Sequence, residues 1–464
     1  MRKGAVAAIG AVVVLVAGYA GATAWSGRVT EKRHAEQLAL MQGEVAGARP
    51  VERSFQRGFF TSQSTTSFQI GCAAADGKPP LRVTVADTIR NGPIAGGTVA
   101  AAVIDSQVTL GGSEGERINA MFTGAPLKVH TVVGFGGGYT STLQSGAATM
   151  PISDGAELAW QGLSGTVRGQ SGSRAFSYAL KSPGLTILDP ARGTKVTLAG
   201  LDVRAEGGAV KGASLLGLGK AQGSLDAMTM ELKLPTPAGE AGAPVVVSFT
   251  GLAFASDTQV ASELLANTST VTGAGVVNGA KIDRFEMQAS MKRLHAPTYQ
   301  RLMEKLTSAG ADCGTAAKEA VAAQMLETLQ ADVMALLQHN PEFALDKLTV
   351  EHAGQRGEVA YSISVQGLTA ADAQQPLMAA LMRGARLTAS MRLPVAWVRR
   401  AAAEGASRLQ GTAPAPALVD VMVEEATAKG FVVRDGDYLT SRVEFAAGAL
   451  TVNGKGLPMG GKPP

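Results

Sequence analysis

Hydrophobic and polar positions alternate with a period of two through much of the chain after residue 51. This alternation is typical of half-buried strands, and glycine-containing turns such as Arg57-Gly58 and Gly134 to Gly138 separate the segments. We therefore expect antiparallel hairpins. The predicted strands are Ser54–Gln56, Thr66–Ile70, Leu81–Ala86, Ala100–Leu110, Leu127–Val133, Tyr139–Leu143, Val196–Val203, Ser224–Leu234, Val247–Phe254 and Ala280–Met291.

A weak internal repeat relates the segment Val196–Val203 to Val247–Phe254. The spacing favours a recurring strand unit over a short-period solenoid. Glycine is also abundant, with 57 residues, and glycine inside a strand often marks a bulge or a bend. Together these features predict a strongly curved sheet.

The period becomes helical at Pro297, and helices then alternate with further strands. We expect an α+β protein in which a long curved antiparallel sheet packs against amphipathic helices of the C-terminal half. The predicted helices begin at Pro297 and near Thr315 and span Ala370–Met382, Pro394–Leu409 and Ala417–Lys429. The later strands are Leu345–Glu351, Glu358–Gln366 and Ala385–Leu393, and a closing meander comprises Phe431–Arg434, Leu439–Ala446 and Ala449–Asn453.

The helix from Thr315 carries an apolar stripe that is open to two interpretations. Val321, Met325, Leu329 and Val333 recur at spacings of three and four, which is typical of a helix that covers its own sheet. The functional alternative is a movable lid over an apolar cavity.

An apolar run from Gly4 to Trp25 follows Arg2 and Lys3. Its length matches the roughly 20 residues that span a bilayer as a helix and exceeds the core of a signal peptide. Ala22-Thr23-Ala24 keeps cleavage open as an alternative. We predict a signal anchor (1–27), a juxtamembrane helix and linker (28–48), a β-rich periplasmic region (49–294) and a mixed region on the same sheet (295–464).

The net charge of +4 is confined to the first 33 residues, and the remainder holds 37 basic and 37 acidic residues. No basic stripe with interleaved aromatic residues follows, so nucleic-acid binding is excluded. Cys72 and Cys313 form the possible disulfide of an exported chain, and two buried thiols remain the alternative.

Several short motifs follow one another along the chain: Phe55 to Ser62, Asn91-Gly92-Pro93, the helices after Pro297 and the strand Leu450 to Gly454. In the order of these motifs the chain resembles the YdgA-like bacterial envelope family, whose function is uncharacterised. The resemblance implies a single-pass inner-membrane protein with most of its chain in the periplasm of a Gram-negative bacterium. It implies no catalytic or cofactor residues.

The Arg57-Gly58-Phe59-Phe60 segment predicts a tight turn in which Gly58 takes a positive φ and the aromatic residues pin the next strand. The functional alternative is a contact surface of Arg57, Phe59 and Phe60, in which Arg57 grips a lipid phosphate or a partner carboxylate.

No catalytic, metal or cofactor site is predicted. Gly111 to Gly115 matches the nucleophile elbow around Ser113, but we expect a polar loop there, and His130, the nearest base, belongs to a strand. The Gly134 to Gly138 loop lacks a phosphate-binding Lys, and Asp435-Gly436-Asp437 is typical of a turn. The histidines lack metal-ligand spacing; they are His34, His130, His295, His339 and His352.

Two functional hypotheses follow. The first is a non-enzymatic scaffold or regulator that contacts other envelope proteins and is held in the inner membrane through residues 4–25. The second is a lipid-binding or lipid-bridging protein whose apolar groove holds phospholipid. The two differ in whether inward positions such as Val196, Leu198, Val247 and Phe249 face a closed core or an open trough.

Overall fold

A computed structural model describes residues 48–58, 60–70, 80–92, 94–153, 155–170, 175–210, 213–235, 241–311, 329–369, 371–372, 375–401 and 416–457. The predicted anchor, the juxtamembrane helix, Phe59, Cys72, Cys313, Val321 and Met325 lie outside these residues. The chain divides into two compact units. Unit 1 contains residues 1–226 and 300–326, and unit 2 contains residues 227–299 and 327–464, so that both α4 (Ala296–Ala311) and β14 (Ala213–Pro235) cross the border.

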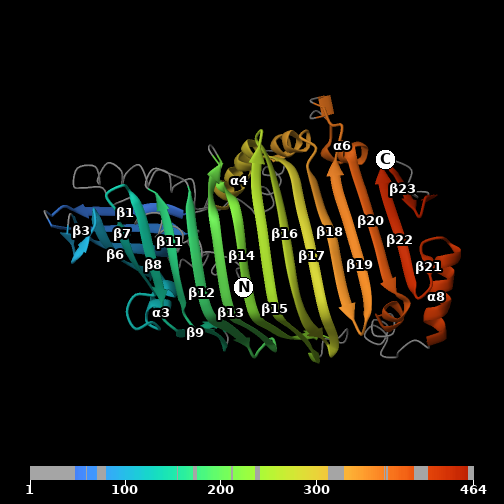
Figure 1. The fold of residues 1–464 in the computed structure, drawn as a ribbon, viewed down its shortest axis with the longest axis horizontal. Helices are drawn as coiled ribbons and strands as arrows, with labels where there is room; N and C mark the ends of the chain where they lie inside the picture. The colour runs from blue at the N-terminus through green and yellow to red at the C-terminus, as the bar shows by residue number, and fades with distance from the viewer. Residues whose placement is uncertain are drawn as a thin grey trace. The chain divides into compact units, whose positions relative to one another are not determined.

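Unit 1 is an antiparallel sheet with the strand order β1-β2-β3-β6-β7-β8-β11-β12-β13, and β9-β10 extends it along the second half of β12 (Figure 1). The strands β4 and β5 form a separate hairpin. The bounds are β1 (Ala48–Gln56), β2 (Thr61–Ile70), β3 (Leu81–Asn91), β4 (Ile94–Ala95), β5 (Thr98–Val99), β6 (Ala102–Gly111), β7 (Leu127–Val133), β8 (Gly138–Ser145), β9 (Ala148–Ser153), β10 (Ala156–Trp160), β11 (Leu163–Gln170), β12 (Phe176–Asp189) and β13 (Thr194–Val210).

One face of the unit 1 sheet is closed. Alternate residues of β3, β6, β7, β8 and β11 bury two apolar clusters, in agreement with the period of two in the sequence. A polar row crosses the same face, because Ser64, Asp87 and Ser106 are direct neighbours on β2, β3 and β6 and all three are buried. One cluster consists of Val83, Val85, Val108, Leu127, Val129, Leu143 and Val167, and the other of Ile89, Ala102, Ile104 and Val133.

The turn between β1 and β2 lies where the sequence predicts it, but the predicted role of Gly58 is wrong. Gly58 is not among the glycines with a positive φ. The need for glycine comes instead from close packing, because a Cβ at this position would collide with the carbonyl group of Thr61. Glycine is required at position 58 because the backbone there passes too close to the Thr61 carbonyl group to leave room for a side chain.

The polar loop predicted around Ser113 is also wrong, because residues Ser113–Asn119 form a short helix, α3. The Asn119 side chain bonds both the backbone N–H and the carbonyl of Leu110 and so ties the end of α3 to β6. A Cβ at Gly115 would lie within 3.0 Å of Leu110, so this glycine allows the helix to pack closely on the strand.

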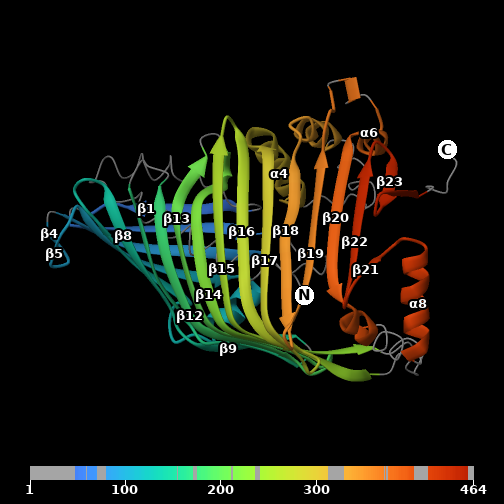
Figure 2. The ribbon, with the colours of Figure 1, turned by 45° about the vertical axis from the view of Figure 1, so that its right-hand side comes forward.

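Unit 2 is an antiparallel meander with the order β15-β16-β17-β18-β19-β20-β22-β23-β24, and β21 pairs with the start of β22. Its long strands bend along their length, as the sequence predicts (Figure 2). The bounds are β15 (Ala241–Ala261), β16 (Leu264–Val277), β17 (Ala280–His295), β18 (Glu342–His352), β19 (Gln355–Val365), β20 (Ala385–Pro394), β21 (Val433–Asp435), β22 (Tyr438–Ala446), β23 (Ala449–Val452) and β24 (Lys455–Leu457).

The internal repeat corresponds to two strands that share a backbone feature. Gly200 in β13 and Gly251 in β15 occupy matching positions of the repeat and have φ values of 66° and 58°. At Gly251 the register of β15 against β16 shifts between Thr250 and Ala253, which is a bulge. The repeat therefore marks a glycine conformation that ordinary residues rarely adopt.

Helices of unit 2 lie at the ends of its strands. They are the start of α4, residues 329–337, α6 (Leu377–Gly384), residues 395–401 and α8 (Pro416–Ala428). The predicted helix 370–382 is wrong at its start, because Asp372 Oδ2 accepts hydrogen bonds from the Thr369 amide (2.7 Å) and hydroxyl (2.9 Å) and holds a turn before Pro376. The closing meander has a fourth strand, β24, that was not predicted.

The prediction of a mainly antiparallel β protein with a few helices is thus confirmed. Within the described residues, no helix is both long enough and apolar enough to cross a bilayer.

Candidate functional site

The unit 2 sheet has two chemically different faces. One face presents apolar side chains on every strand from β15 to β22, and cross-strand pairs join Phe285 to Val350, Met287 to Leu348 and Leu348 to Val359. The same face continues across β20 and β22, where Leu387 pairs with Phe445.

The opposite face of the same strands is charged and internally paired. Lys347 Nζ lies 3.4 Å from Glu286 Oε2 between β18 and β17, and Lys292 Nζ lies 3.0 Å from Glu342 Oε1. Lys347 holds the pKa of Glu286 below its usual value, chiefly through this hydrogen bond. The asymmetry shows that this face is suited to water, whereas the apolar face is not.

The apolar face is covered at its two ends and open between them. On β19, Val365 is only 7% exposed, because it packs with Met334, Leu368 and Ala380 beneath residues 329–337 and α6. Two residues along the same face, Ile363 is 43% exposed. Its cross-strand neighbour Phe343 is exposed as well. The cover therefore ends between Val365 and Ile363.

At the other end of β19, Gly357 is buried under the indole of Trp397, where a Cβ would lie 2.5 Å from the ring. Further across the sheet, Phe249 and Phe285 meet edge to face with ring centroids 5.5 Å apart, over Gly273 and Gly275. These glycines allow the rings to approach the backbone closely, because a Cβ at position 273 or 275 would lie within 3.0 Å of a ring atom.

The four positions chosen from the sequence to separate a closed core from an open trough are Val196 and Leu198 in unit 1 and Val247 and Phe249 in unit 2. All four are partly buried, as are their neighbours Thr197 and Ser248 on the opposite face.

Two histidines of unit 2 stack at the end of β17. The rings of His295 and His339 lie 4.0 Å apart and nearly parallel, His295 Nδ1 is 2.8 Å from Thr298 Oγ1, and His295 Nε2 is 3.5 Å from a carboxylate oxygen of Glu263. Burial, and then the neighbouring His295, lower the pKa of His339, while Glu263 opposes this shift. Parallel rings do not direct their nitrogens at one point, and no group of metal-ligating side chains occurs among the described residues.

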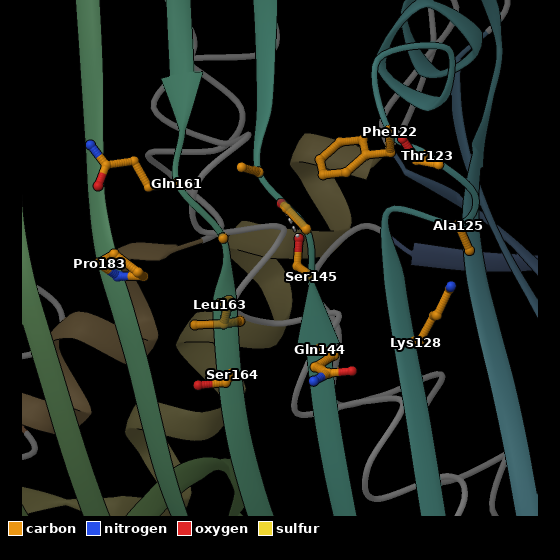
Figure 3. A pocket seen from close by; sticks show the side chains of 13 residues that line it. Phe122, Thr123, Ala125, Lys128, Gln144, Ser145, Gln161, Leu163, Ser164 and Pro183 are labelled. Carbon is orange, nitrogen blue, oxygen red and sulfur yellow. Dashed lines mark hydrogen bonds between the residues drawn. The ribbon is translucent and has the colours of Figure 1, made fainter.

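A hollow of about 550 Å³ lies on the outer face of unit 1, where β8 gives way to β9 and β10 to β11 (Figure 3). Lys128, Gln144 and Ser164 come from three neighbouring strands, and Phe122 closes one side. Lys128 supplies the one charge among the described residues that line it. A single cation beside amides and hydroxyls offers neither an acid–base pair nor a metal-ligand set.

The residues that the sequence suggested as candidates for catalysis do not lie together in the structure. Ser113 lies at the start of α3 after the β6 strand, whereas His130 lies within β7. His130 Nδ1 is 2.7 Å from Asp105 Oδ1, and Arg90 binds the other oxygen of Asp105 at 2.8 Å. Arg57 and Phe60 are both exposed at the β1–β2 turn, as a contact surface requires.

Sequence reasoning missed Phe343, Tyr361 and Ile363 as exposed apolar positions. Their strands alternate like the buried strands of unit 1, so the alternation carried no signal that would separate them.

No curated protein and no solved structure matches the chain. A family model described as a bacterial protein of unknown function matches residues 1–459, which is nearly the whole chain. The chain therefore belongs to this bacterial family of unknown function, DUF945.

Proposed function

We propose that this chain is a lipid-binding protein of the bacterial envelope, and that the open apolar face of unit 2 holds acyl chains. The YdgA-like resemblance and the apolar run at residues 4–25 support an inner-membrane anchor with both units in the periplasm. The exposure step on β19, from buried Val365 to open Ile363, is the observation that carries the proposal.

The dimensions of the open face suit an acyl chain. Along β19 the open part extends from Val359 to Ile363, about 13 Å at the usual rise per residue. Across the strands, the apolar series from β15 to β22 covers about 29 Å at the usual strand spacing. Half of a bilayer's hydrocarbon core is about 15 Å thick, so an extended acyl chain fits across the strands, whereas along β19 it would reach slightly beyond the open part.

The side chains on this face suit a ligand of variable shape. Met287 and Met291 on β17 and Met391 on β20 contribute to this face, and methionine adapts to irregular apolar surfaces because it is unbranched and polarizable. On β15 and β16 this face also carries a polar cluster, in which Asn267 Nδ2 donates to Ser256 Oγ and Thr258 Oγ1 (both 2.8 Å), so the methionines and their apolar neighbours supply the surface for acyl chains. The face is expected to accept several phospholipids.

A charge placed on the open face tests the proposal. We expect Ile363→Glu to lower the phospholipid that remains with the detergent-purified full chain about tenfold, because a carboxylate in contact with acyl chains loses its hydration. Bound phospholipid is measured by native mass spectrometry and by phosphate analysis of an organic extract.

The matched control is Ser362→Glu, which adds the same charge to the opposite, polar face one residue away. It should retain the lipid of the unchanged chain. Equal lipid in all three proteins, or none in the unchanged chain, would contradict the proposal. Melting curves confirm that both variants are folded.

A second candidate function, contact with another envelope protein, rests on α6. Met378 and Met382 are exposed one helical turn apart, while Leu377 and Leu381 of the same helix pack on the buried cluster. A helix that is apolar on its outer side as well as its inner side is typical of a binding surface.

For this candidate we expect a photo-crosslinking residue at Met378 to give one discrete crosslinked product in intact cells. The same residue at Ala446, which is exposed at the end of β22, should give none. Met382→Glu should weaken the Met378 product at least threefold, since it places a charge within the contact. Equal products at both positions would rule out a specific contact.

A further inference from the structure

Four large apolar side chains are exposed at the loops of one end of the unit 1 sheet. The exposed fractions are 75% for Phe60, 70% for Ile94, 77% for Val99 and 51% for Phe135. They come from three separate connections, which are the β1–β2 turn, the β4–β5 hairpin and the β7–β8 turn. Isolated apolar residues on a surface are ordinary, but a group of this kind at one edge is not.

Backbone hydrogen bonds fix these three connections beside one another. The Asn91 amide donates to Phe60 O (2.9 Å), the Gly92 amide to Ala101 O (2.8 Å) and the Ala101 amide to Val133 O (2.8 Å). The strands β2, β3, β6 and β7 that carry the loops are consecutive in the sheet. Three strand spacings place the loops within about 15 Å of one another.

The β4–β5 hairpin projects from the protein on a buried base. Its base is fixed by Ala95 and Ala100, which are buried with Val103, whereas Ile94 and Val99 face each other across the hairpin and point away from that base. Gly96 and Gly97 have φ values of 56° and 84° and allow the tight turn between them. Figure 2 shows this hairpin at the far end of the unit 1 strands.

The charge of the edge is positive. The segments 57–62, 90–102 and 132–140 contain Arg57 and Arg90 and no Asp or Glu. Arg90 is held by Asp105 of β6, whereas exposed Arg57 makes no hydrogen bond or ion pair with the described residues. A cation beside protruding aromatic and aliphatic residues is the combination found where proteins enter the membrane interface.

We propose that this edge of unit 1, defined by Arg57, Phe60, Ile94, Val99 and Phe135, inserts into the interface of an anionic phospholipid bilayer. The apolar tips enter the boundary between head groups and acyl chains, and Arg57 binds lipid phosphate. The chain supplies a route to that bilayer. Only 22 residues separate Trp25, the end of the apolar run, from Ala48 at the start of β1, which allows at most about 80 Å.

Membrane insertion differs from acyl-chain binding by unit 2 and does not depend on it. It uses exposed side chains that protrude from turns, so they can enter a fluid layer without complementary pockets. A protein partner would require such a pocket for each side chain, and the test below separates the two cases.

The test places a fluorescent probe on the edge of the full chain in vesicles. Val99→Trp is reconstituted into phosphatidylglycerol-containing vesicles whose acyl chains carry bromine, which quenches tryptophan on contact. We expect the added emission, taken as the difference from the unchanged chain, to fall by roughly half, because interfacial residues lie about 5–10 Å into the boundary.

The matched control is Thr123→Trp, an exposed position in the loop before β7, at the other end of that strand. Its emission should remain unquenched. In the Val99→Trp chain, a further Phe60→Asp change should abolish the quenching. A further Arg57→Gln change should lower the quenching at least twofold in anionic vesicles at low salt. In phosphatidylcholine vesicles, Arg57→Gln should leave the quenching unchanged.

Unquenched emission from Val99→Trp would overturn the proposal and leave a protein as the occupant of this edge. Equal quenching at residues 99 and 123 would overturn it as well, because the approach to the bilayer would then be unspecific. Circular dichroism identifies any variant that has failed to fold, and Ile94→Trp then replaces Val99→Trp as the probe.

Discussion

Replacing Ile104 by Ala is expected to lower the free energy of unfolding of unit 1 by about 2–5 kcal/mol, which is the usual cost of removing most of a fully buried aliphatic side chain. Ile104 has no exposed surface and packs with Ile89, Ala102 and Val133 on the closed face of the sheet. Because its neighbours are held by the strands on both sides, they cannot collapse into the cavity. Urea unfolding of the purified chain measures the loss.

The chain contains its own control, since Ile94 is the same residue type ten positions earlier. Ile94 is largely exposed, so Ile94→Ala should change the free energy of unfolding by no more than about 0.5 kcal/mol. The same change should, however, weaken bilayer contact of the edge. Equal destabilisation by the two substitutions would contradict the division into a closed face and exposed tips.

The sequence predicts which face of a strand is apolar, because apolar and polar residues alternate between adjacent positions. Val83 and Val85 point into the core of unit 1, as the pattern indicates. Whether a face is covered was not predictable. Leu348 and Val359 alternate in the same way, yet they lie on a face whose cover stops near Val365. Whether a strand face is covered depends on helices that lie many residues away in the sequence. The local alternation of apolar and polar residues does not show where those helices pack.

Turns were predicted well where a glycine is flanked by clear strands, but the reason for the glycine was not always apparent. Gly137 and Gly436 have positive φ values at the expected hairpin turns. Gly58 does not, and its requirement arises from the Thr61 carbonyl three residues away. Helix α3 escaped prediction because tertiary bonds from Asn119 to β6 stabilise a segment that is too short to form a helix alone.

The candidate surfaces were only partly visible in the sequence. Phe60 was identified because it lies in a distinctive motif with Arg57. Ile94 and Val99 lie in one glycine-containing hairpin and Phe135 in another turn, and they join that motif only through the pairing of β3, β6 and β7. They could have been found by searching for apolar residues at the tips of turns that do not belong to an alternating apolar and polar pattern.

The polar row on the closed face of unit 1 has an unusual centre. Asp87 Oδ2 accepts a hydrogen bond of 2.7 Å from the Ser64 hydroxyl, but Asp87 Oδ1 and the Ser106 hydroxyl, on the neighbouring strand, are buried without a hydrogen bond. Burial raises the pKa of the Asp87 carboxyl, and the nearby Ser106 and Ser64 hydroxyls offset only part of this effect. The folded chain therefore holds this proton over a pH range in which the unfolded chain has released it.

The sign of the pH dependence follows from the raised pKa. The contribution of Asp87 to stability is complete below the unfolded-state pKa, about 3.9. It is lost as the pH rises through the higher pKa of the folded state. Asn at this position is neutral at every pH, and its amide can donate to Ser106 while its oxygen accepts from Ser64.

We therefore expect Asp87→Asn to raise the free energy of unfolding by about 1–3 kcal/mol at neutral pH, which is the usual cost of a buried polar group without a partner. The gain should shrink towards acid pH, where the carboxyl of the unchanged chain is protonated. Urea unfolding from about pH 4 to pH 8 measures both effects.

Asp105→Asn is the control, because Asp105 lies on the outer face, where Arg90 and His130 bind it in water. It should cost no more than about 1 kcal/mol. Loss of stability in Asp87→Asn at neutral pH would show that the carboxylate is satisfied in the folded chain.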